Sequence, residues 1–325
     1  MVNLSEKDKV FLPFLARRIQ DIQKKNILFA HYTSAATAIK IIQNGELWMR
    51  SVMDMNDLSE VDLGCELVLK AFAQKKLRKK YDDALKKFGM EIDGLIATGK
   101  YEFAEMKKHV FVTCLSEHKP CNTFGRLSMW RAYAPANGVT LIMDSQIVAP
   151  HPQGGVFFGA VPILYLKQDD KKSVHDILSQ IALNLKKTCI NIGSQECGSR
   201  LLGSVYAQAA SIKHIAFKTE REWRLVLSAS PSVSLNIANS SVLSKGVEDI
   251  GGLLQPIYKL NLNKLYAVGT ADSGYSFISR ILKKIIIGPS RNSALLHEAL
   301  CDELYSAGIS EPQDMVEISG IPLRL

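Results

Sequence analysis

Residues 27–50, ILFAHYTSAATAIKIIQNGELWMR, contain the signals for a strand, a helix and a second strand in immediate succession. The apolar run ILFAHY is typical of a short buried strand. Thr33 and Ser34 follow it and supply hydroxyl groups that can cap the next helix, AATAIKIIQ. Asn44-Gly45 is a common helix stop, and ELWMR is again typical of a strand. This strand–helix–strand unit is the starting point of the predicted fold.

Further elements are predicted on both sides of this unit. Residues 4–24 form an amphipathic pattern typical of a helix, with Pro13 disfavouring a regular helix in its early part. Two helices are expected near residues 60–88 and 99–108. The remaining predictions are strands at 109–116, 139–144, 222–227, 265–268, 284–287 and 316–318, a hairpin of 156–158 with 161–166, and helices at 127–133, 171–190, 199–215 and 291–307.

The predicted helices and strands alternate irregularly, without the strict strand–helix–strand rhythm of parallel sheets. This pattern favours an α+β fold with a mixed or antiparallel sheet core and added helices. We find no internal repeat, low-complexity segment or clear linker. We therefore predict a single domain over residues 1–325, with a helical insertion at approximately 60–108.

The composition is that of an ordinary globular protein, 47% hydrophobic and 22% charged. The beginning of the chain lacks the apolar segment of a signal peptide, and no apolar run approaches the roughly 18 residues of a membrane span. None of the six cysteines lies in a CxxC pair, and no Cys/His cluster has zinc spacing. We expect a cytoplasmic protein with free thiols, no bound metal and no membrane contact. The oligomeric state remains open.

The formal net charge of +8 favours an anionic partner. Much of the excess lies in residues 75–80, KKLRKK, and continues to Lys86 and Lys87 on a predicted helix. The alternatives are a solvated helix face, a surface for nucleic acid or an acidic protein, and the interface of a purely structural partner protein.

Two short motifs contain the main candidate site residues. In HYTS, His31 ends a buried strand where its imidazole can donate to a ligand hydroxyl, with Thr33 or Ser34 facing the same ligand; the alternative is a structural histidine. In KTEREWR, Glu220 and Glu222 are two positions apart, so on a strand both point to one face. Arg224 shares that face, and the alternative is a structural salt bridge.

Three weaker motifs complete the candidates. Trp130 and Tyr133 share one face of a short helix, where they either stack on a flat ring or fill the core. Asn56-Asp57 with Glu60 resembles a helix cap as much as a site. The segment 288–290, GPS, lies at a strand–helix junction that can bind phosphate but has no glycine-rich signature.

These pieces also carry a family resemblance. HYTS, IIQNGELW, MNDLSE, FVTCLSE, MWRAYAPANGVTLIMD, FKTEREWRLV and KKIIIGPS occur in this order over nearly the whole chain. The series resembles a bacterial family described as domain of unknown function 2971, whose name carries no activity. HYTS with the following helix and IIQNG is also similar, more distantly, to the first strand–helix unit of ADP-ribosyltransferases of the His-Tyr-Glu group.

The second resemblance implies an ADP-ribosyltransferase-like fold and site. His31 matches the first-strand histidine, Glu222 the catalytic glutamate, and Glu220 an additional acidic residue. The family's middle tyrosine is missing, and FVTCLSE has Ser116 at the corresponding place. Either Ser116 replaces that tyrosine, or an aromatic side chain stacks on nicotinamide: Tyr32 or, from the adjoining helix, Trp130 or Tyr133.

The implied activity is cleavage of NAD⁺ at the nicotinamide–ribose bond, with transfer of ADP-ribose to nucleic acid or protein, in a toxin or phage-defence role. A carboxylate beside the ribose would stabilise its oxocarbenium-like transition state, and no metal is required. Tyr32, Thr33, Ser116, Trp130 and Tyr133 join His31 as the expected NAD⁺-binding residues. The alternative is a non-catalytic nucleotide- or nucleic-acid-binding module on the same fold.

Overall fold

The computed structural model describes residues 2–54, 59–97, 108–134, 137–149, 158–167, 170–228, 240–250, 252–266 and 276–322. Its strands are β1 (Leu28–Ser34), β2 (Glu46–Ser51), β3 (Val110–His118), β4 (Gly138–Met143), β5 (Phe158–Pro162), β6 (Leu164–Leu166), β7 (Ile212–His214), β8 (Glu222–Ser228), β9 (Leu243–Ile250), β10 (Leu253–Asn261), β11 (Leu282–Ile287) and β12 (Val316–Ile318).

The α-helices are α1 (Glu6–Phe11), α2 (Pro13–Lys24), α3 (Ala35–Asn44), α4 (Ser59–Phe72), α5 (Lys75–Leu85), α7 (Leu127–Tyr133), α8 (Lys171–Lys187), α9 (Ser194–Ala210), α11 (Leu262–Leu265), α12 (Ser276–Arg280) and α13 (Ser293–Ser306). Short 3₁₀ helices are η1 (Val52–Asp54), η2 (Lys86–Phe88), η3 (Ser145–Val148), η4 (Ile215–Glu220) and η5 (Pro312–Asp314). The predicted α+β class is confirmed.

The strand–helix–strand unit at residues 27–50 forms as predicted. Ser34 caps α3 by accepting a hydrogen bond from the backbone N–H of Thr37 at 3.1 Å. Gly45 ends α3 with a left-handed φ of 63°, a conformation that glycine adopts at little cost. The helix predicted at residues 4–24 is instead two helices, because Pro13 occupies the first position of α2 and interrupts the hydrogen bonding of α1.

β3 is the branching strand of the sheet. Its C-terminal part pairs with β1, its N-terminal part with β2, and β8 pairs along most of its opposite edge. The sheet continues as β1-β4-β11-β12 on one side and as β2-β10-β9 on the other, while β5 borders β8. The described pairs of this sheet are antiparallel apart from β11 with β12, so the prediction of a mixed sheet is confirmed.

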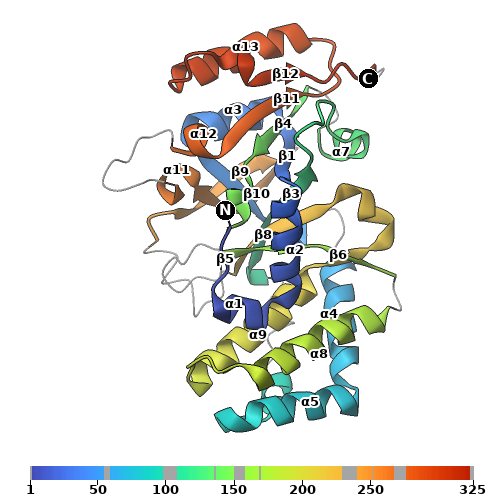
Figure 1. The fold of residues 1–325 in the computed structure, drawn as a ribbon. Coiled ribbons are helices and arrows are strands. Elements are labelled where there is room, and N and C mark those ends of the chain that lie inside the picture. The colour runs from blue at the N-terminus through green and yellow to red at the C-terminus, as the bar shows by residue number, and fades with distance from the viewer. Residues whose placement is uncertain are drawn as a thin grey trace.

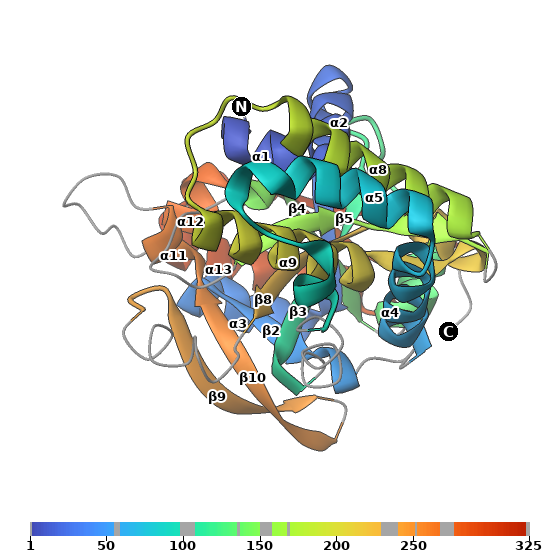
Figure 2. The same ribbon diagram turned by 90° about the horizontal axis from the view of Figure 1, so that it is seen from below.

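Four helices form a separate layer at one end of the molecule. Figure 1 shows α4, α5, α8 and α9 below the sheet, and Figure 2 shows α5 and α8 side by side at that end. Tyr81 of α5 is buried and donates a hydrogen bond to the carbonyl of Leu178 on α8 at 2.9 Å. The helices α4 and α5 lie between β2 and β3 in the chain, within the segment predicted as a helical insertion.

Two predicted elements are wrong. The hairpin predicted from residues 156–158 and 161–166 is wrong, because residues 158, 161 and 162 belong to one strand, β5, which pairs with β8, while β6 pairs with β7. Residues 156 and 157 lie outside the described residues. The strand predicted from Leu265 is also wrong at its start, since α11 ends there. Most of the helix predicted near 99–108, and Asn56-Asp57 of the predicted cap, lie outside the described residues. The single-domain organisation stays a prediction.

Buried apolar side chains lie on both faces of the sheet. One cluster combines Phe29, Leu141 and Trp223 with residues of α2, α3, α12 and α13. A second lies between the sheet and the helices α4, α5, α8 and α9, and a third packs α7 against β1, β4 and β11. The second and third clusters lie on the same sheet face, where Val226 and Tyr32 belong to them. A group of polar side chains also lies on this face.

Candidate functional site

The polar group is positioned by three consecutive elements of the chain. Lys213 lies on β7, Glu220 ends η4, and Glu222 begins β8. Arg221 between the two glutamates has φ 46° and ψ 49°, a left-handed conformation that turns the chain sharply from η4 into β8. This turn allows a glutamate on a helix and a glutamate on a strand to approach the same lysine.

Lys213, Glu220, Glu222 and Arg224 form a buried ionic network. The Lys213 ammonium lies 2.8 Å from Glu220 Oε2 and 3.0 Å from Glu222 Oε2. Arg224 Nε donates to Glu222 Oε1 at 2.7 Å, and its Nη1 donates to the carbonyl of Ala210 at 3.0 Å. Two cations therefore face two carboxylates, an arrangement that offsets much of the desolvation cost of burying charge.

Glu222 is ionised within this network. Burial alone would raise its pKa, but the charges of Arg224 and Lys213, with hydrogen bonds from Arg224 and Cys114, hold the pKa at about 2. Glu222 is only 4% exposed. A carboxylate that stays negative in so dry a place is a strong local source of electrostatic potential.

Aromatic side chains surround the network. The Tyr133 hydroxyl donates to Glu220 Oε1 at 3.3 Å, and the Tyr165 hydroxyl accepts from the backbone N–H of Glu222 at 2.7 Å. The Lys213 ammonium lies 4.7 Å from the ring centre of Phe217. Tyr133 and Phe217 are 39% and 37% exposed, so the network is buried beneath aromatic groups that reach the surface.

The structure brings three of the predicted site residues together with a fourth beside them. Tyr133 and the two glutamates meet in the ionic network. Ser116 is fully buried, and its hydroxyl donates to the backbone carbonyl of Glu220. Glu220 is not on a strand, because it ends η4, so alternation along a strand does not place the two glutamates on one face. The two carboxylates nevertheless meet, through Lys213.

His31 lies on the opposite face of the sheet from Glu222. It pairs in register with Leu141, which packs in the same cluster as Trp223, and side chains of neighbouring residues alternate between faces. Strand β3 also separates the two strands. The His31 ring interacts with the carbonyl of Cys114 through Nδ1 at 3.1 Å, and burial lowers its pKa.

The other predicted binding residues form a neighbouring group. Tyr32 and Trp130 are buried with their rings edge to face, 4.8 Å between centres. The Tyr32 hydroxyl accepts from the backbone N–H of Arg126 at 2.8 Å, and Trp130 Nε1 donates to the carbonyl of Phe124 at 2.8 Å. Both rings are therefore engaged within the core, whereas Thr33 on β1 is half-buried.

Lys213, Tyr165 and Cys114 were missed by the sequence reasoning. The sequence contained one indication that Lys213 is buried with a partner. It follows an apolar stretch near the end of the helix predicted over 199–215, and a lysine in such a place either pairs with a buried carboxylate or points out of the core. Tyr165 and Cys114 belong to chain segments distant from Glu222, so no local pattern indicated their contacts.

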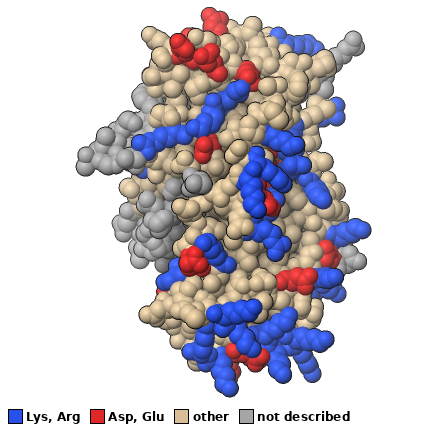
Figure 3. Space-filling model, in the orientation of Figure 1, with Lys and Arg blue, Asp and Glu red and all other residues tan. Residues whose placement is uncertain are grey.

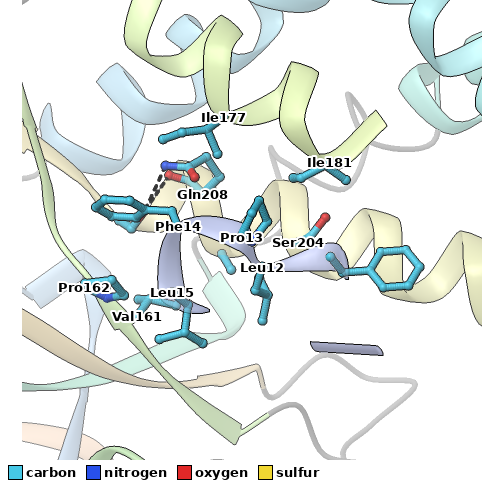
Figure 4. Close-up of a pocket in the computed structure, with 13 residues that line it drawn as sticks. Leu12, Pro13, Phe14, Leu15, Val161, Pro162, Ile177, Ile181, Ser204 and Gln208 are labelled. Carbon is cyan, nitrogen blue, oxygen red and sulfur yellow. Dashed lines mark hydrogen bonds between the residues drawn. The ribbon is translucent and has the colours of Figure 1, made fainter. Parts of the chain in front are cut away.

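One pocket of the described surface lies away from the ionic network. It lies between the start of α2 and the helices α8 and α9, and its lining is mostly apolar (Figure 4). Two of its polar side chains, Gln208 and Ser211, are hydrogen-bonded to each other. Gln208 Nε2 donates to Ser211 Oγ at 3.1 Å. None of the predicted site residues lines this pocket.

Among the comparisons with known proteins, one match was found, and it is to a family model. Residues 129–225 match the model of the family described as "Protein of unknown function (DUF2971)", a segment that includes Tyr133, Lys213 and both glutamates. This match supports the resemblance to that family. Searches of curated proteins and of solved structures find no match.

Two further findings describe the part of the chain that the structure covers. Within it, no group of three or more His, Cys, Asp or Glu side chains is arranged to hold a metal ion. None of its helices combines the length and the apolar character that crossing a membrane requires.

Proposed function

We propose that the protein cleaves NAD⁺ at the nicotinamide–ribose bond and transfers ADP-ribose to a macromolecular acceptor, with the ionic network as its catalytic centre. The observation that supports this most is the convergence of Glu220, Glu222 and Tyr133. It places an ionised carboxylate, a second carboxylate and a partly exposed aromatic ring within one small volume.

Glu222 has the properties that this chemistry needs. As the C1′–N bond breaks, nicotinamide leaves with the electron pair and the ribose acquires oxocarbenium character. A carboxylate that accepts a hydrogen bond from the ribose 2′-hydroxyl stabilises that charge more in the transition state than in the substrate. For this contact the ribose hydroxyl takes the place of one present partner of Glu222, and Lys213 keeps its bond to Glu220.

Glu220 and Tyr133 have complementary roles in the proposal. The acceptor nucleophile forms the new bond to C1′, and its proton passes to Glu220, which lies nearer the surface aromatics. Tyr133 supplies the flat wall for nicotinamide, since its ring is partly exposed while Tyr32 and Trp130 are engaged in the core. His31 has no role in this proposal, because its side chain lies on the sheet face opposite Glu222.

Label transfer tests this proposal. NAD⁺ labelled in its adenylate phosphate is incubated with the protein and with either nucleic acid or protein extract, and macromolecule-bound label is counted. We expect Glu222→Gln to lose roughly a hundred-fold in transfer rate, the scale of one electrostatic contact to the transition state. Glu66→Gln, at an exposed carboxylate on α4, is the matched control and should retain full transfer. Equal transfer by both variants would place the chemistry elsewhere.

A nucleic-acid-binding module is the second candidate, and the charge distribution favours it. α5 and η2 carry seven Lys or Arg residues against two Asp, and α8 carries four lysines against one Asp. Their combined excess equals the formal net charge of the whole chain, +8. Figure 3 shows these basic side chains gathered over the end of the molecule where α5 and α8 lie. Such a surface suits the phosphate backbone of a nucleic acid.

Charge reversal on α5 tests the second candidate. We expect glutamate at Lys75, Lys76, Lys79 and Lys80 to weaken oligonucleotide binding ten-fold or more, since phosphate contacts dominate such affinity. The control reverses four exposed lysines outside this surface: Lys24, Lys25, Lys245 and Lys264. Fluorescence anisotropy at two salt concentrations measures both. Binding that survives the α5 changes, or is lost equally in the control, contradicts this candidate.

A further inference from the structure

Strand β9 forms one edge of the large sheet. It pairs with β10, and among the described residues no other strand borders it. Figure 2 shows β9 outside β10, at the margin of the molecule. The backbone N–H and C=O groups along the outer side of an edge strand can pair with a strand of another chain.

The pairing of β9 with β10 determines which residues of β9 offer these groups. Two residues separate Ile250 from Leu253, which lie opposite each other, and the closing pair of a two-residue hairpin is hydrogen-bonded. Hydrogen-bonded and non-hydrogen-bonded pairs then alternate, which makes Val247 and Pro256 a non-hydrogen-bonded pair. Pro256 has no N–H group and suits this position. Val247, and with it every second residue of β9, therefore directs its backbone groups away from β10.

The side chains of these residues form a charge pattern that is complementary to itself. Lys245, Val247 and Asp249 alternate along β9, so they share one sheet face, and each is exposed. A second copy of β9 that runs antiparallel can place Val247 opposite its own counterpart. Lys245 of each copy then lies opposite Asp249 of the other, so the new ladder contains two oppositely charged pairs. Within the described residues, neither of these two side chains forms an ion pair.

Other antiparallel registers centred in this strand fit less well. A residue whose backbone groups point outward has to face another of the same kind, so the two-fold axis passes through a residue and not between two. An axis at Glu248 would place two carboxylates directly opposite each other, which is destabilising. An axis at Gly246 would place Lys245 opposite Val247, without an acidic partner. The axis at Val247 is the register that pairs Lys245 with Asp249.

Exposed apolar side chains lie on the same sheet face around this axis. Val247 is 63% exposed and Leu254 is 72% exposed, and Pro256 is exposed as well. Paired residues of antiparallel strands share a face, so Leu254, which pairs with Asp249, lies on the face of Val247. Pairing of two copies brings their Val247 side chains into contact and extends this apolar group across the interface, which removes apolar surface from water.

We propose that two copies of this chain pair through β9, antiparallel about a two-fold axis at Val247, so that their sheets join. A lysine on an edge strand ordinarily opposes such pairing, but here Asp249 of the second copy neutralises Lys245. The inference is independent of NAD⁺ cleavage, because Glu222 lies on β8 and takes no part in the contact. Since the contact is short, we expect a dimer that dissociates at micromolar concentrations.

Sedimentation equilibrium at several protein concentrations tests the pairing. Lys245→Asp sets carboxylates opposite each other at two places, and Val247→Pro removes an outward N–H group without touching a bond to β10. We expect each change to weaken dimerisation ten-fold or more. Lys24→Asp, at an exposed lysine in the last turn of α2, carries the same change of charge and should dimerise like the natural protein. Cooperative unfolding transitions show that the variants are folded.

A mixture of two variants tests the register itself. Lys245→Asp and Asp249→Lys each place like charges opposite each other in their own dimers, but both pairs regain opposite charges in the mixed dimer. We expect the mixture to associate at least ten-fold more tightly than either variant alone. Asp249 Oδ1 also accepts from the backbone N–H of Gly252 at 2.8 Å. If the loss of this bond unfolds Asp249→Lys, the results with Lys245→Asp and Val247→Pro decide the proposal.

Three results overturn the proposal. The first is a natural protein that stays monomeric at submillimolar concentration. The second is a dimer whose affinity is unaffected by Lys245→Asp and Val247→Pro, which would place the contact on another surface. The third is a mixture of folded Lys245→Asp and Asp249→Lys that associates no better than either variant alone.

Discussion

Lys213→Met is expected to lower the free energy of unfolding by about 3–5 kcal/mol, because removing one partner of a buried ionic network leaves the others without compensation. Lys213 is 3% exposed and contacts both carboxylates. Methionine fills a similar volume but cannot neutralise them, so Glu220 and Glu222 would share the remaining cation, Arg224. Urea unfolding measures the change through the midpoint and slope of the transition.

The control for this experiment is Lys70→Met. Lys70 pairs with Glu66 on the surface of α4, where ion pairs contribute between zero and about 1 kcal/mol. Adding Glu220→Gln to Lys213→Met should recover part of the lost stability, since it removes one of the two carboxylates that would otherwise share Arg224. A loss below about 1 kcal/mol for Lys213→Met would contradict the role assigned to the network.

Acidification from pH 5 to pH 2 is expected to remove stability on the order of 3 kcal/mol through Glu222 alone. The pKa of this residue is about 2 in the folded protein against an ordinary 4.5. A carboxyl group with a lowered folded pKa stabilises the fold above its unfolded pKa, and this contribution is lost as the pH falls through the folded value. His31 acts in the same direction at higher pH, because burial lowers its pKa and protonation below about pH 6.5 favours the unfolded chain.

Unfolding free energies of the natural protein and Glu222→Gln, measured at intervals between pH 7 and the lowest pH at which both fold, test this linkage. The variant should start less stable and should lose less stability between pH 5 and pH 2. Parallel curves over that range would show that the ionisation of Glu222 is not coupled to folding.

Local patterns in the sequence predicted the elements whose signals are local. The unit at residues 27–50 forms as expected because its cap, its glycine stop and its apolar periodicity all lie within a few residues of each other. The pairing of Arg224 with Glu222 was predictable for the same reason, since alternate residues of a strand share a face.

Contacts between segments that are distant in the chain were not predictable from local patterns. Residues 156–158 and 161–166 have strand-like sequences and lie close together in the chain, which suggested a hairpin. The described residues among them belong to β5 and β6, and each of these strands pairs with a strand more distant in the chain. The helix predicted over 199–215 covers most of α9, all of β7 and the first residue of η4. It was predicted as one helix because the apolar residues there suit a helix or a strand.

The candidate site was predictable in its residues more than in its geometry. Glu222 and Glu220 were found from their spacing, but their meeting depends on the left-handed turn at Arg221, which the residue type disfavours. Likewise, the position of His31 on the opposite face follows from the register of β1 against β4, and no single-sequence pattern contains that register.

Nicotinamide release from NAD⁺ by the purified protein tests the central claim most directly, because it needs no knowledge of the acceptor. The account predicts release by the natural protein and by Glu66→Gln, and roughly a hundred-fold slower release by Glu222→Gln. The three proteins should have cooperative unfolding transitions, so that a loss of activity is not a loss of fold. No release by the folded natural protein, with or without nucleic acid or protein extract, or equal release by Glu222→Gln, would contradict the assignment of NAD⁺ cleavage to this network.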